Sequence, residues 1–360
     1  MQVIAFTGGG TGGHVYPGLA VLDYLKKNFP YRFIWIGSCD GMEKEIVENH
    51  GVEYFGVPSG KLRRYLSWRN ITDLFQVFRG YRACLKLLKK FKPLLIFSKG
   101  GFVSVPPVYA ARRLKIPVVS HESDFDPGLA TRLNARASQF ICVPYNESLP
   151  FFLPRYQDRL VVTGNPVREE LLEGRKDWIR QTWNVPSQVP VLLVLGGSLG
   201  AVQLNELVKA RLETWRGRLF VVHQTGSSWA GPPSTPWYVA RPYFTTEMPD
   251  LYAGADLVLA RAGAGTLWEA AAAKTPLFLV PLESGSRGDQ IRNAELFKRA
   301  GAAEVWRPSE GEEIFDARLN AVLETPALRA AMKKALEQFP AGEAAKKIAQ
   351  ILMSFKSVEA

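Results

Sequence analysis

The residues best suited to chemistry stand near the start of the chain, in the run Thr7-Gly8-Gly9-Gly10-Thr11-Gly12-Gly13-His14. An apolar stretch precedes this run, and Pro17 follows it at a place where a helix can begin. Glycines let a backbone approach a phosphate closely, and the N–H groups and dipole at the start of a helix attract its charge. The pattern predicts an anion-binding loop, with His14 at its edge as a neutral imidazole that can accept a proton.

A single loop of this kind has two other interpretations. Gly8, Gly10 and Gly13 fit the dinucleotide-binding pattern G-x-G-x-x-G, with Asp40 as the acid that would bind a ribose. Alternatively, the glycines only turn a strand into a helix. Similar glycine segments follow two later apolar runs, at residues 196–200 and 261–266, and this repetition favours phosphate binding.

Short apolar runs alternate with helical patterns along most of the chain. Such alternation predicts a mostly parallel, doubly wound sheet in each half. The pattern breaks between Pro166 and Pro190, which indicates entry into a second domain. The expected strands lie at residues 3–6, 32–37, 52–57, 94–97, 117–120, 140–143, 161–163, 191–195, 219–223, 237–240, 256–260, 277–280 and 305–306, and the clearest helices at residues 17–28, 41–50, 108–114 and 290–299 and from residue 203.

The composition is that of a folded, soluble protein. The chain has 360 residues, of which 47% are hydrophobic and 22% charged, enough for two domains with full cores. No apolar run approaches the roughly 20 residues needed to cross a bilayer, and no signal peptide is evident, so the chain is expected to stay in the cytoplasm. Cys39, Cys84 and Cys142 are odd in number and widely spaced, which predicts reduced packing residues.

The net charge of +11 is concentrated in residues 61–92, which carry ten basic residues and the single acid Asp73. Ile71, Leu74, Phe75 and Phe78 recur there at helical spacing. The segment predicts an amphipathic helix that can lie on an anionic membrane surface. For its C-terminal half, a core-facing helix with a solvated basic side is equally open. A nucleic acid partner is not expected, because the sequence shows no helix-turn-helix, zinc-ligand set or RNP-like strand.

Two domains of this type facing one another would bring the carboxyl ends of both sheets, with their glycine loops, to one cleft. Two anion-binding loops suit a reaction in which donor and acceptor each carry phosphate, because backbone N–H groups and a cation can stabilise a departing diphosphate without a metal. We expect Ser198 and Arg168 to hold one diphosphate. Glu269 is expected to accept two hydroxyls of a ribose.

Seven motifs lie at residues 7–17, 98–106, 121–123, 164–168, 196–201, 261–269 and 286–294. Together they resemble the MurG family of GT-B glycosyltransferases over essentially the whole chain. The resemblance implies an α/β GT-B fold of two Rossmann-like, doubly wound parallel-sheet domains facing across a cleft. Residues 1–166 would bind the acceptor and the membrane, residues 167–340 would bind UDP-GlcNAc, and the helix at 341–360 would pack back on the first domain.

The family's activity would be an inverting transfer of GlcNAc from UDP-GlcNAc to the C4 hydroxyl of the MurNAc of lipid I, undecaprenyl-pyrophosphoryl-MurNAc-pentapeptide, for peptidoglycan synthesis. The enzyme would be peripheral at the cytoplasmic face of the cell membrane, would need no cofactor or metal, and would use His14 as general base. A GT-B enzyme that glycosylates diacylglycerol, a UDP-GlcNAc 2-epimerase and a non-enzymatic basic scaffold are the alternatives.

The resemblance also assigns roles to individual residues. Phe244 would meet the uracil through its main chain, Gln290 would meet the sugar, and Arg168 and Ser198 would hold the phosphates. Residues expected around the donor phosphate and ribose are Ala264, Gly265, Thr266, Leu267, Trp268 and Glu269, and those facing the acceptor are Thr11, Gly12 and Gly13. The membrane patch would comprise Leu62, Arg63, Arg64, Trp68, Arg69, Ile71, Phe75, Phe78 and Arg79.

Asp124 is a departure from the family pattern, since many members have asparagine there. An ionised carboxylate cannot donate a hydrogen bond to a sugar, so Asp124 either contacts the sugar as an acceptor, orients His14 or shares the role of base. Asp124-Phe125-Asp126 also forms a D-x-D pattern, which binds a metal in GT-A transferases, but the glycine loops already provide phosphate stabilisation. His50 and His223 are interpreted as structural, while His121 is open between structure and catalysis.

Overall fold

The computed structural model describes residues 1–60, 69–197, 200–227, 229–283 and 288–355, without the side chains of residues 69–74. The chain divides into two compact units, one formed by residues 1–168 with the C-terminal segment from Glu343, the other by residues 169–342. Each division falls two residues after the position expected from the sequence (168 against 166, and 342 against 340).

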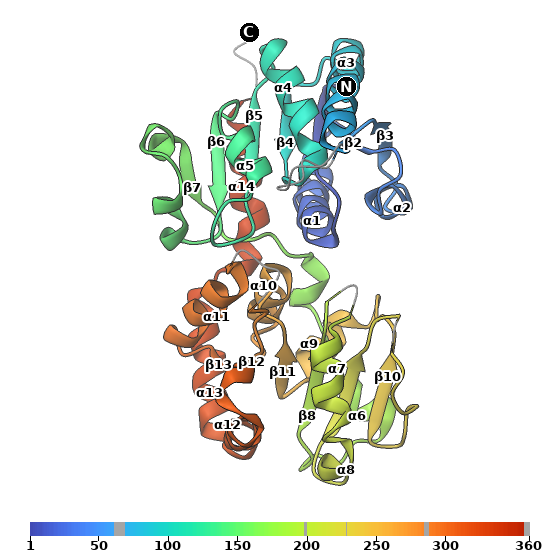
Figure 1. The fold of residues 1–360 in the computed structure, drawn as a ribbon, viewed down its shortest axis with the longest axis vertical. Helices are drawn as coiled ribbons and strands as arrows, with labels where there is room; N and C mark the ends of the chain where they lie inside the picture. The colour runs from blue at the N-terminus through green and yellow to red at the C-terminus, as the bar shows by residue number, and fades with distance from the viewer. Residues whose placement is uncertain (61–68, 198–199, 228, 284–287, 356–360) are drawn as a thin grey trace. The chain divides into compact units, whose positions relative to one another are not determined.

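The first unit is built on a seven-stranded sheet whose neighbouring strands are all parallel (Figure 1). Its strands are β1 (Val3–Thr7), β2 (Arg32–Ser38), β3 (Glu53–Val57), β4 (Leu95–Ser98), β5 (Val118–His121), β6 (Phe140–Val143) and β7 (Leu160–Val162), in the order β3-β2-β1-β4-β5-β6-β7. The order reverses between β1 and β4. The loops after these two strands therefore form the topological switch point, where ligands bind in sheets of this kind.

Both faces of this sheet are buried, because successive residues of a strand point to opposite sides. Ile4 and Phe6 of β1 belong to one core, and Val3 and Ala5 to the other. The first core includes α1 (Gly12–Asn28), α2 (Glu43–Asn49) and the C-terminal α14 (Ala344–Met353), which contacts α1; the second includes α3 (Arg69–Phe91) and α4 (Val105–Arg113). The remaining helices are α5 (Leu129–Asn134), η1 (Phe102–Ser104), η2 (Asn146–Phe151) and η3 (Pro154–Arg159).

The prediction that the first helix begins at Pro17 is wrong. α1 begins at Gly12 with Thr11 as its N-cap, so Pro17 lies inside the helix. The missing N–H of Pro17 falls opposite the carbonyl of Gly13, four residues earlier, and Gly13 is exposed, so water can satisfy that carbonyl. α4 likewise begins at Val105 and not at residue 108, because its prolines occupy the first turn, where a helix tolerates them.

The second unit contains a six-stranded sheet, again with all neighbouring strands parallel. The order reverses between the strands that begin at Val191 and Leu257, so the predicted glycine segments at 196–200 and 261–266 both follow strands of the switch point. The strands are β8 (Val191–Leu195), β9 (Phe220–Gln224), β10 (Tyr238–Arg241), β11 (Leu257–Ala260), β12 (Leu277–Leu279) and β13 (Ala303–Val305), in the order β10-β9-β8-β11-β12-β13.

Helices also cover the second sheet, and aromatic contacts fill its core. Phe315 packs edge-on against Phe278 and Trp306, with ring centroids 5.2 and 5.1 Å apart. The predicted fold class, two doubly wound parallel-sheet units, is confirmed. The helices are η4 (Glu169–Leu172), α6 (Trp178–Trp183), α7 (Val202–Lys209), α8 (Leu212–Trp215), α9 (Met248–Gly254), α10 (Ala264–Ala273), α11 (Asp289–Arg299), η5 (Pro308–Glu310), α12 (Glu312–Glu324), α13 (Pro326–Ala335) and η6 (Leu336–Gln338), with η7 (Ala341–Glu343) at the boundary.

The cysteines are all free thiols. Cys84 and Cys142 are buried packing residues, as predicted. The same prediction is wrong for Cys39, which is exposed because it lies in the turn after β2, beyond the last buried residue of that strand.

Candidate active site

His14 lies in the first turn of α1, where Thr11 holds both its backbone and its ring. Its N–H donates to the Thr11 carbonyl at 3.0 Å, and its Nδ1 is 3.0 Å from Thr11 Oγ1. The ring lies over Gly100, since a Cβ added to Gly100 would be 3.8 Å from His14 Nε2. The ring therefore has a fixed orientation at the β1/β4 switch point.

The glycine loop already holds a carboxylate that belongs to the protein. Glu43 is fully buried and accepts hydrogen bonds from the Gly10 N–H at 3.1 Å, the Ser38 N–H at 3.0 Å and the Ser38 hydroxyl at 2.6 Å. A Cβ on Gly9 would collide with this carboxyl group. The predicted anion-binding loop therefore has fewer N–H groups available to an anion than the sequence indicated, because the Gly10 N–H already donates to Glu43.

The loop after β4 packs directly on the loop after β1. The Lys99 N–H donates to the Thr7 carbonyl at 2.7 Å. Gly101 has a φ of 76°, and a Cβ there would collide with the Gly9 carbonyl, so only glycine fits this contact. The two loops of the switch point thus form one continuous surface around His14.

Asp124 follows β5 at the same edge of the first sheet and is half-buried. Its N–H donates to Glu122 Oε1 at 3.1 Å. In the D-x-D pattern, Phe125 is buried and Asp126 forms an ion pair with Arg132 at 2.6 Å. The described part of the chain contains no group of three or more His, Cys, Asp or Glu side chains placed to hold a metal ion.

Arg168 belongs to the first compact unit. The sequence had indicated the second domain, which was expected to begin at residue 167. Its guanidinium carbon lies 5.4 Å from the ring centroid of Tyr16, a residue of α1. Its Nε is buried and has no hydrogen-bond acceptor among the residues that the structure describes. Arg168 therefore presents a donor near the first turns of α1.

The switch point of the second unit has open glycines. Among the residues that the structure describes, no heavy atom lies within 4 Å of a Cβ added at Gly197, Gly263 or Gly265. Gly263 is the N-cap of α10, whose first turn contains no acidic residue, so its N–H groups and dipole can attract an anion. Ser198, the predicted phosphate ligand in this region, lies outside the described residues.

Glu269 and the residues before it divide between two sides of α10. Glu269 is half-buried and its Oε2 accepts a hydrogen bond from the Tyr252 hydroxyl at 3.0 Å, while Gly265 is exposed and Thr266 half-buried. These three residues share a face, because positions three and four apart are neighbours on a helix. The side chains of Leu267 and Trp268 are buried in the core, so only their backbone could contact a ligand at this turn.

Three more residues were predicted to bind the sugar donor. Two of them already use polar atoms in hydrogen bonds within the protein. The Phe244 N–H donates to Gln224 Oε1 at 3.1 Å, which leaves the Phe244 carbonyl for a nucleobase. Gln290 Oε1 accepts from the Leu282 N–H at 3.0 Å, which leaves the amide nitrogen of Gln290 for a sugar. Ala264 is buried at the start of α10, so a ligand could reach only its backbone.

The basic helix is α3, and its C-terminal half packs on the second core of the first unit. Cys84 and Leu88 are buried, while Lys86 and Lys89 are exposed. The alternative of a core-facing helix with a solvated basic side is therefore correct for this half.

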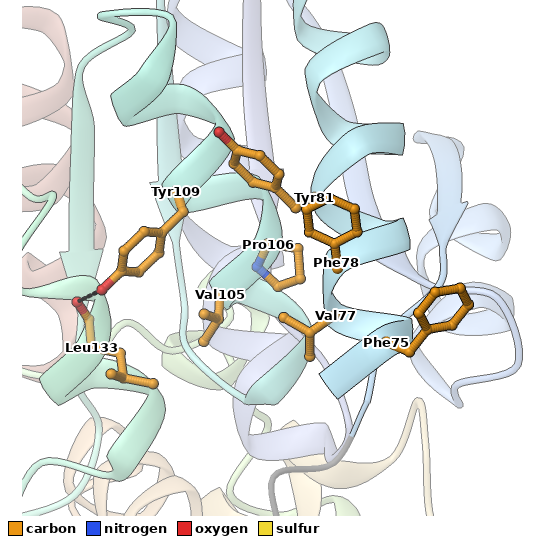
Figure 2. A pocket seen from close by; sticks show the side chains of 8 residues that line it. All are labelled: Phe75, Val77, Phe78, Tyr81, Val105, Pro106, Tyr109 and Leu133. Atoms are coloured by element: carbon orange, nitrogen blue, oxygen red, sulfur yellow. Dashed lines mark hydrogen bonds between the residues drawn. The ribbon is translucent and has the colours of Figure 1, made fainter. Parts of the chain in front are cut away.

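The earlier part of α3 leaves apolar side chains in solvent. Phe75 is 62% and Phe78 54% exposed, and Arg82 lies 6.0 Å from the Phe78 ring centroid. These phenylalanines line an apolar groove of about 700 Å³, to which α3, α4 and α5 contribute. Figure 2 shows its lining side chains. Its lining residues are Phe75, Val77, Phe78, Tyr81, Val105, Pro106, Tyr109 and Leu133.

The other predicted membrane residues cannot be placed as side chains. Leu62, Arg63, Arg64 and Trp68 lie outside the described residues. Arg69 and Ile71 fall in α3, but only its backbone is described there, whereas Arg79 is described and exposed. Among the described residues, no helix combines the length and apolar character required to traverse a bilayer.

The remaining histidines have structural contacts. His50 Nε2 lies 2.7 Å from Asp23 Oδ1 on the surface. His121 is fully buried and its Nε2 donates to the Gly164 carbonyl at 3.0 Å, so a structural role is favoured over catalysis. Burial, with the nearby charge of Lys99, holds the pKa of His121 well below its ordinary value.

His223 should make stability depend on pH. It is buried between the Tyr238 hydroxyl and Asn205 Oδ1, both at 3.0 Å, and burial lowers its pKa from 6.5 to about 4. Between these values the unfolded chain binds a proton that the folded chain does not, so stability falls as pH falls. We expect this residue to cost about 3 kcal/mol between pH 7 and 4.

Denaturant unfolding of the wild type and His223→Gln at pH 7 and pH 4.5 would measure this effect. The variant should lose less stability than the wild type on acidification. Parallel losses in the two proteins would contradict the assignment.

Sequence reasoning missed three buried charged residues of the first unit: Glu43, Lys99 and Glu122. Lys99 and Glu122 each follow a strand at the carboxyl edge of the sheet, and that position is a usable signal. Glu43 had no local signal, because its contact with Gly10 spans 33 residues.

Comparison with known families agrees with this architecture. Residues 4–142 match the glycosyltransferase family 28 N-terminal domain, and residues 191–351 match the family's C-terminal domain. The chain belongs to glycosyltransferase family 28. Each matched range covers most of one compact unit.

Relatives of this family 28 chain share one descriptive name, UDP-N-acetylglucosamine–N-acetylmuramyl-(pentapeptide) pyrophosphoryl-undecaprenol N-acetylglucosamine transferase. The relative from Treponema denticola is 45% identical over 327 residues, covering 85% of this chain and 84% of the relative. The relative from Clostridium botulinum is 42% identical over 316 residues, covering 87% of this chain and 88% of the relative.

Solved structures resemble the family 28 chain at the level of the fold. MurG of Acinetobacter baumannii superposes with a TM-score of 0.75 at 24% identity, over 98% of this chain and 100% of that one. A putative UDP-N-acetylglucosamine 2-epimerase of Listeria monocytogenes gives a TM-score of 0.73 at 13% identity, over 99% and 97%. The fold alone therefore does not separate the two activities, whereas the sequence similarity favours the transferases.

Proposed function

We propose that the protein is an inverting glycosyltransferase that moves GlcNAc from UDP-GlcNAc to the C4 hydroxyl of the MurNAc of lipid I. The observation that carries the proposal is His14, held by Thr11 at the β1/β4 switch point in a chain with transferase relatives above 40% identity. The reaction would serve peptidoglycan synthesis.

The second unit would bind the donor. The open N-terminal end of α10, with Gly265 and Thr266, would receive phosphate oxygens, together with Ser198. Glu269 would accept hydrogen bonds from the ribose hydroxyls, the Phe244 carbonyl would meet the uracil, and the Gln290 amide would meet the sugar.

The first unit would bind the acceptor and supply the base. If Thr11 Oγ1 accepts the Nδ1–H of His14, the ring is the tautomer whose Nε2 carries a lone pair. Nε2 would take the proton of the C4 hydroxyl as its oxygen attacks C1 of GlcNAc and the bond from C1 to UDP breaks. Gly12 and Gly13, in the first turn of α1, would face the sugar and the lipid-linked diphosphate.

Charge developing on a diphosphate needs donors already in place. The buried Nε of Arg168 lacks an acceptor among the described residues, which suits a diphosphate oxygen. Asp124 would either accept a hydrogen bond from a sugar hydroxyl or assist His14.

We further propose that α3 attaches the enzyme peripherally to the cytoplasmic face of the membrane. Phe75 and Phe78 expose apolar surface beside the groove of Figure 2, and the exposed Arg79 and Arg82 lie on the same helix. Apolar insertion combined with attraction to anionic lipid headgroups is the usual physical basis of such attachment.

Replacing both phenylalanines (Phe75→Ser with Phe78→Ser) should weaken binding to vesicles containing phosphatidylglycerol by roughly tenfold or more. Turnover with a water-soluble, short-chain acceptor should stay near the wild-type value. Ile314→Ser with Leu328→Ser is the matched control, because these apolar residues are 40% exposed in the second unit. Vesicle co-sedimentation measures the effect, and equal binding by the two double variants would contradict the proposal.

Transfer of labelled GlcNAc from UDP-GlcNAc to a short-chain lipid I analogue, with a chelator present, tests the function itself. The expected result is label in the lipid product. Release of free sugar without an acceptor would favour an epimerase, transfer only to diacylglycerol would favour the other transferase class, and failure to bind UDP by calorimetry would favour a scaffold.

A further inference from the structure

Lys99 is a buried charge that the proposed reaction does not use. It directly follows β4, and its residue is only 1% exposed. It is the only buried lysine in the described part of the chain. Burying an ammonium group is costly unless opposite charges and hydrogen bonds compensate it, so its surroundings indicate what it is for.

The carboxylates and the hydroxyl that compensate the Lys99 charge come from one loop, at residues 122–128. Lys99 Nζ donates to Ser123 Oγ at 2.5 Å. Glu122 ties the same loop together, since its carboxylate accepts from the N–H groups of Ser123 at 2.8 Å, Asp124 at 3.1 Å and Gly128 at 3.0 Å. Lys99 thus holds the loop through a side chain, while Glu122 holds it through the backbone.

Lys99, Glu122 and Asp124 form a charged cluster of one cation and two carboxylates. Burial lowers the pKa of Lys99 to about 8, and the negative charges of Glu122 and Asp124 oppose that shift. Burial alone would raise the pKa of Glu122, yet the Thr131 hydrogen bond, the Lys99 charge and the backbone N–H groups bring it below its ordinary value. His121 is neutral in its buried site, and the Cys142 thiol has its pKa raised by burial to about 12, so neither adds a charge.

The same cluster supports the surface on which His14 rests. A Cβ added to Gly8 would lie 2.9 Å from both Lys99 Cβ and the His14 carbonyl oxygen. A Cβ on Gly100 would lie 3.6 Å from His14 Cδ2 and 3.5 Å from Thr131 Oγ1. The His14 ring and the Thr131 hydroxyl, which bonds to Glu122, therefore contact the same side of Gly100, the residue directly after Lys99.

We propose that Lys99 is a positioning residue of the acceptor site, whose buried ammonium balances Glu122 and Asp124 and so holds the 122–128 loop against the segment that supports His14. The proposal rests on the proposed function in one respect: GlcNAc transfer is one of the two measurements that test it, the other being stability to denaturant. Without the ammonium, two carboxylates would share a poorly hydrated space, and the loop would move to separate or hydrate them.

A charge-swap experiment on the full-length protein tests the proposal. Lys99→Met removes the cation at similar length, and adding Asp124→Asn restores the cluster's net charge of −1, because one lost carboxylate matches the lost cation. We expect Lys99→Met to lower the turnover number by roughly 10–100-fold with less than about a twofold change in the KM for UDP-GlcNAc. The double variant should recover at least about tenfold relative to Lys99→Met.

Lys44→Met is the matched control, because Lys44 is exposed on α2 in the same unit; it should behave as the wild type. If Lys99→Met does not fold well enough for kinetics, the comparison is made by denaturant unfolding, where the double variant should be more stable than Lys99→Met. Asp124→Asn alone completes the comparison. Multiplicative losses in activity and additive losses in stability across Lys99→Met, Asp124→Asn and the double variant would overturn the proposal. The stability coupling would persist even if the wild type transferred no GlcNAc, so failure of the proposed function is separately visible.

Discussion

Replacing His14 with alanine is expected to lower the turnover number of GlcNAc transfer by about 10²–10⁴-fold, the usual contribution of a general base. Affinity for UDP should change by less than about twofold, because the base would contact the acceptor hydroxyl and not the nucleotide. Steady-state transfer with a soluble lipid I analogue gives the turnover number, and calorimetry gives the UDP affinity.

His50→Ala is the matched control for this experiment. His50 lies on the surface of the first unit in an ion pair with Asp23 at 2.7 Å, so its removal should leave turnover near the wild-type value. A His14→Ala enzyme that lost UDP affinity and turnover by the same factor would refute the assignment of His14 as the base.

The second large effect is expected at Glu269. Glu269→Ala should weaken UDP binding by about 10–100-fold, because the carboxylate would accept charge-assisted hydrogen bonds from two ribose hydroxyls. Turnover at saturating UDP-GlcNAc should fall much less, since the ribose does not change during the reaction. Calorimetric titration with UDP measures the loss.

A nucleotide analogue separates a ribose contact from a structural role for Glu269. The wild type should bind 2′-deoxy-UDP more weakly than UDP, whereas Glu269→Ala should distinguish the two poorly. Tyr252→Phe is a useful comparison, because it removes the hydroxyl that donates to Glu269 Oε2 at 3.0 Å but leaves the carboxylate. An unchanged preference for UDP over its deoxy form in Glu269→Ala would argue against the ribose contact.

The positions of the ligand loops could be predicted because their signals are local. A short apolar run followed by glycines appears in the sequence at Gly8, Gly196 and Gly263, and the structure has β1, β8 and β11 directly before these segments. Parallel sheets bring such loops to one edge without any information from distant residues.

The buried charges could not be predicted in the same way. Gly10 meets Glu43 across 33 residues, and Lys99 meets Ser123 across 24. A charged residue in a sequence ordinarily indicates a solvated position, and only the tertiary contacts show that these side chains are enclosed and paired. The sequence therefore predicted more N–H groups available to an external anion in the glycine loop than the structure has, since Glu43 occupies that of Gly10.

Neighbouring residues of a helix face different environments, so a motif on a helix does not place all its side chains on one side. Gly265 is exposed and Leu267, two positions later, is fully buried. The motif at residues 261–269 thus combines positions suited to a ligand with positions suited to the core. Helical periodicity, applied to the motif, separates the two sets.

The most direct test of the account is the structure of the product formed from UDP-GlcNAc and a short-chain lipid I analogue, determined by NMR. The donor's anomeric bond is α, so a single displacement by the C4 hydroxyl predicts a β-linked GlcNAc on C4 of MurNAc. An α-linkage, attachment at another hydroxyl or the appearance of free sugar alone would contradict the account.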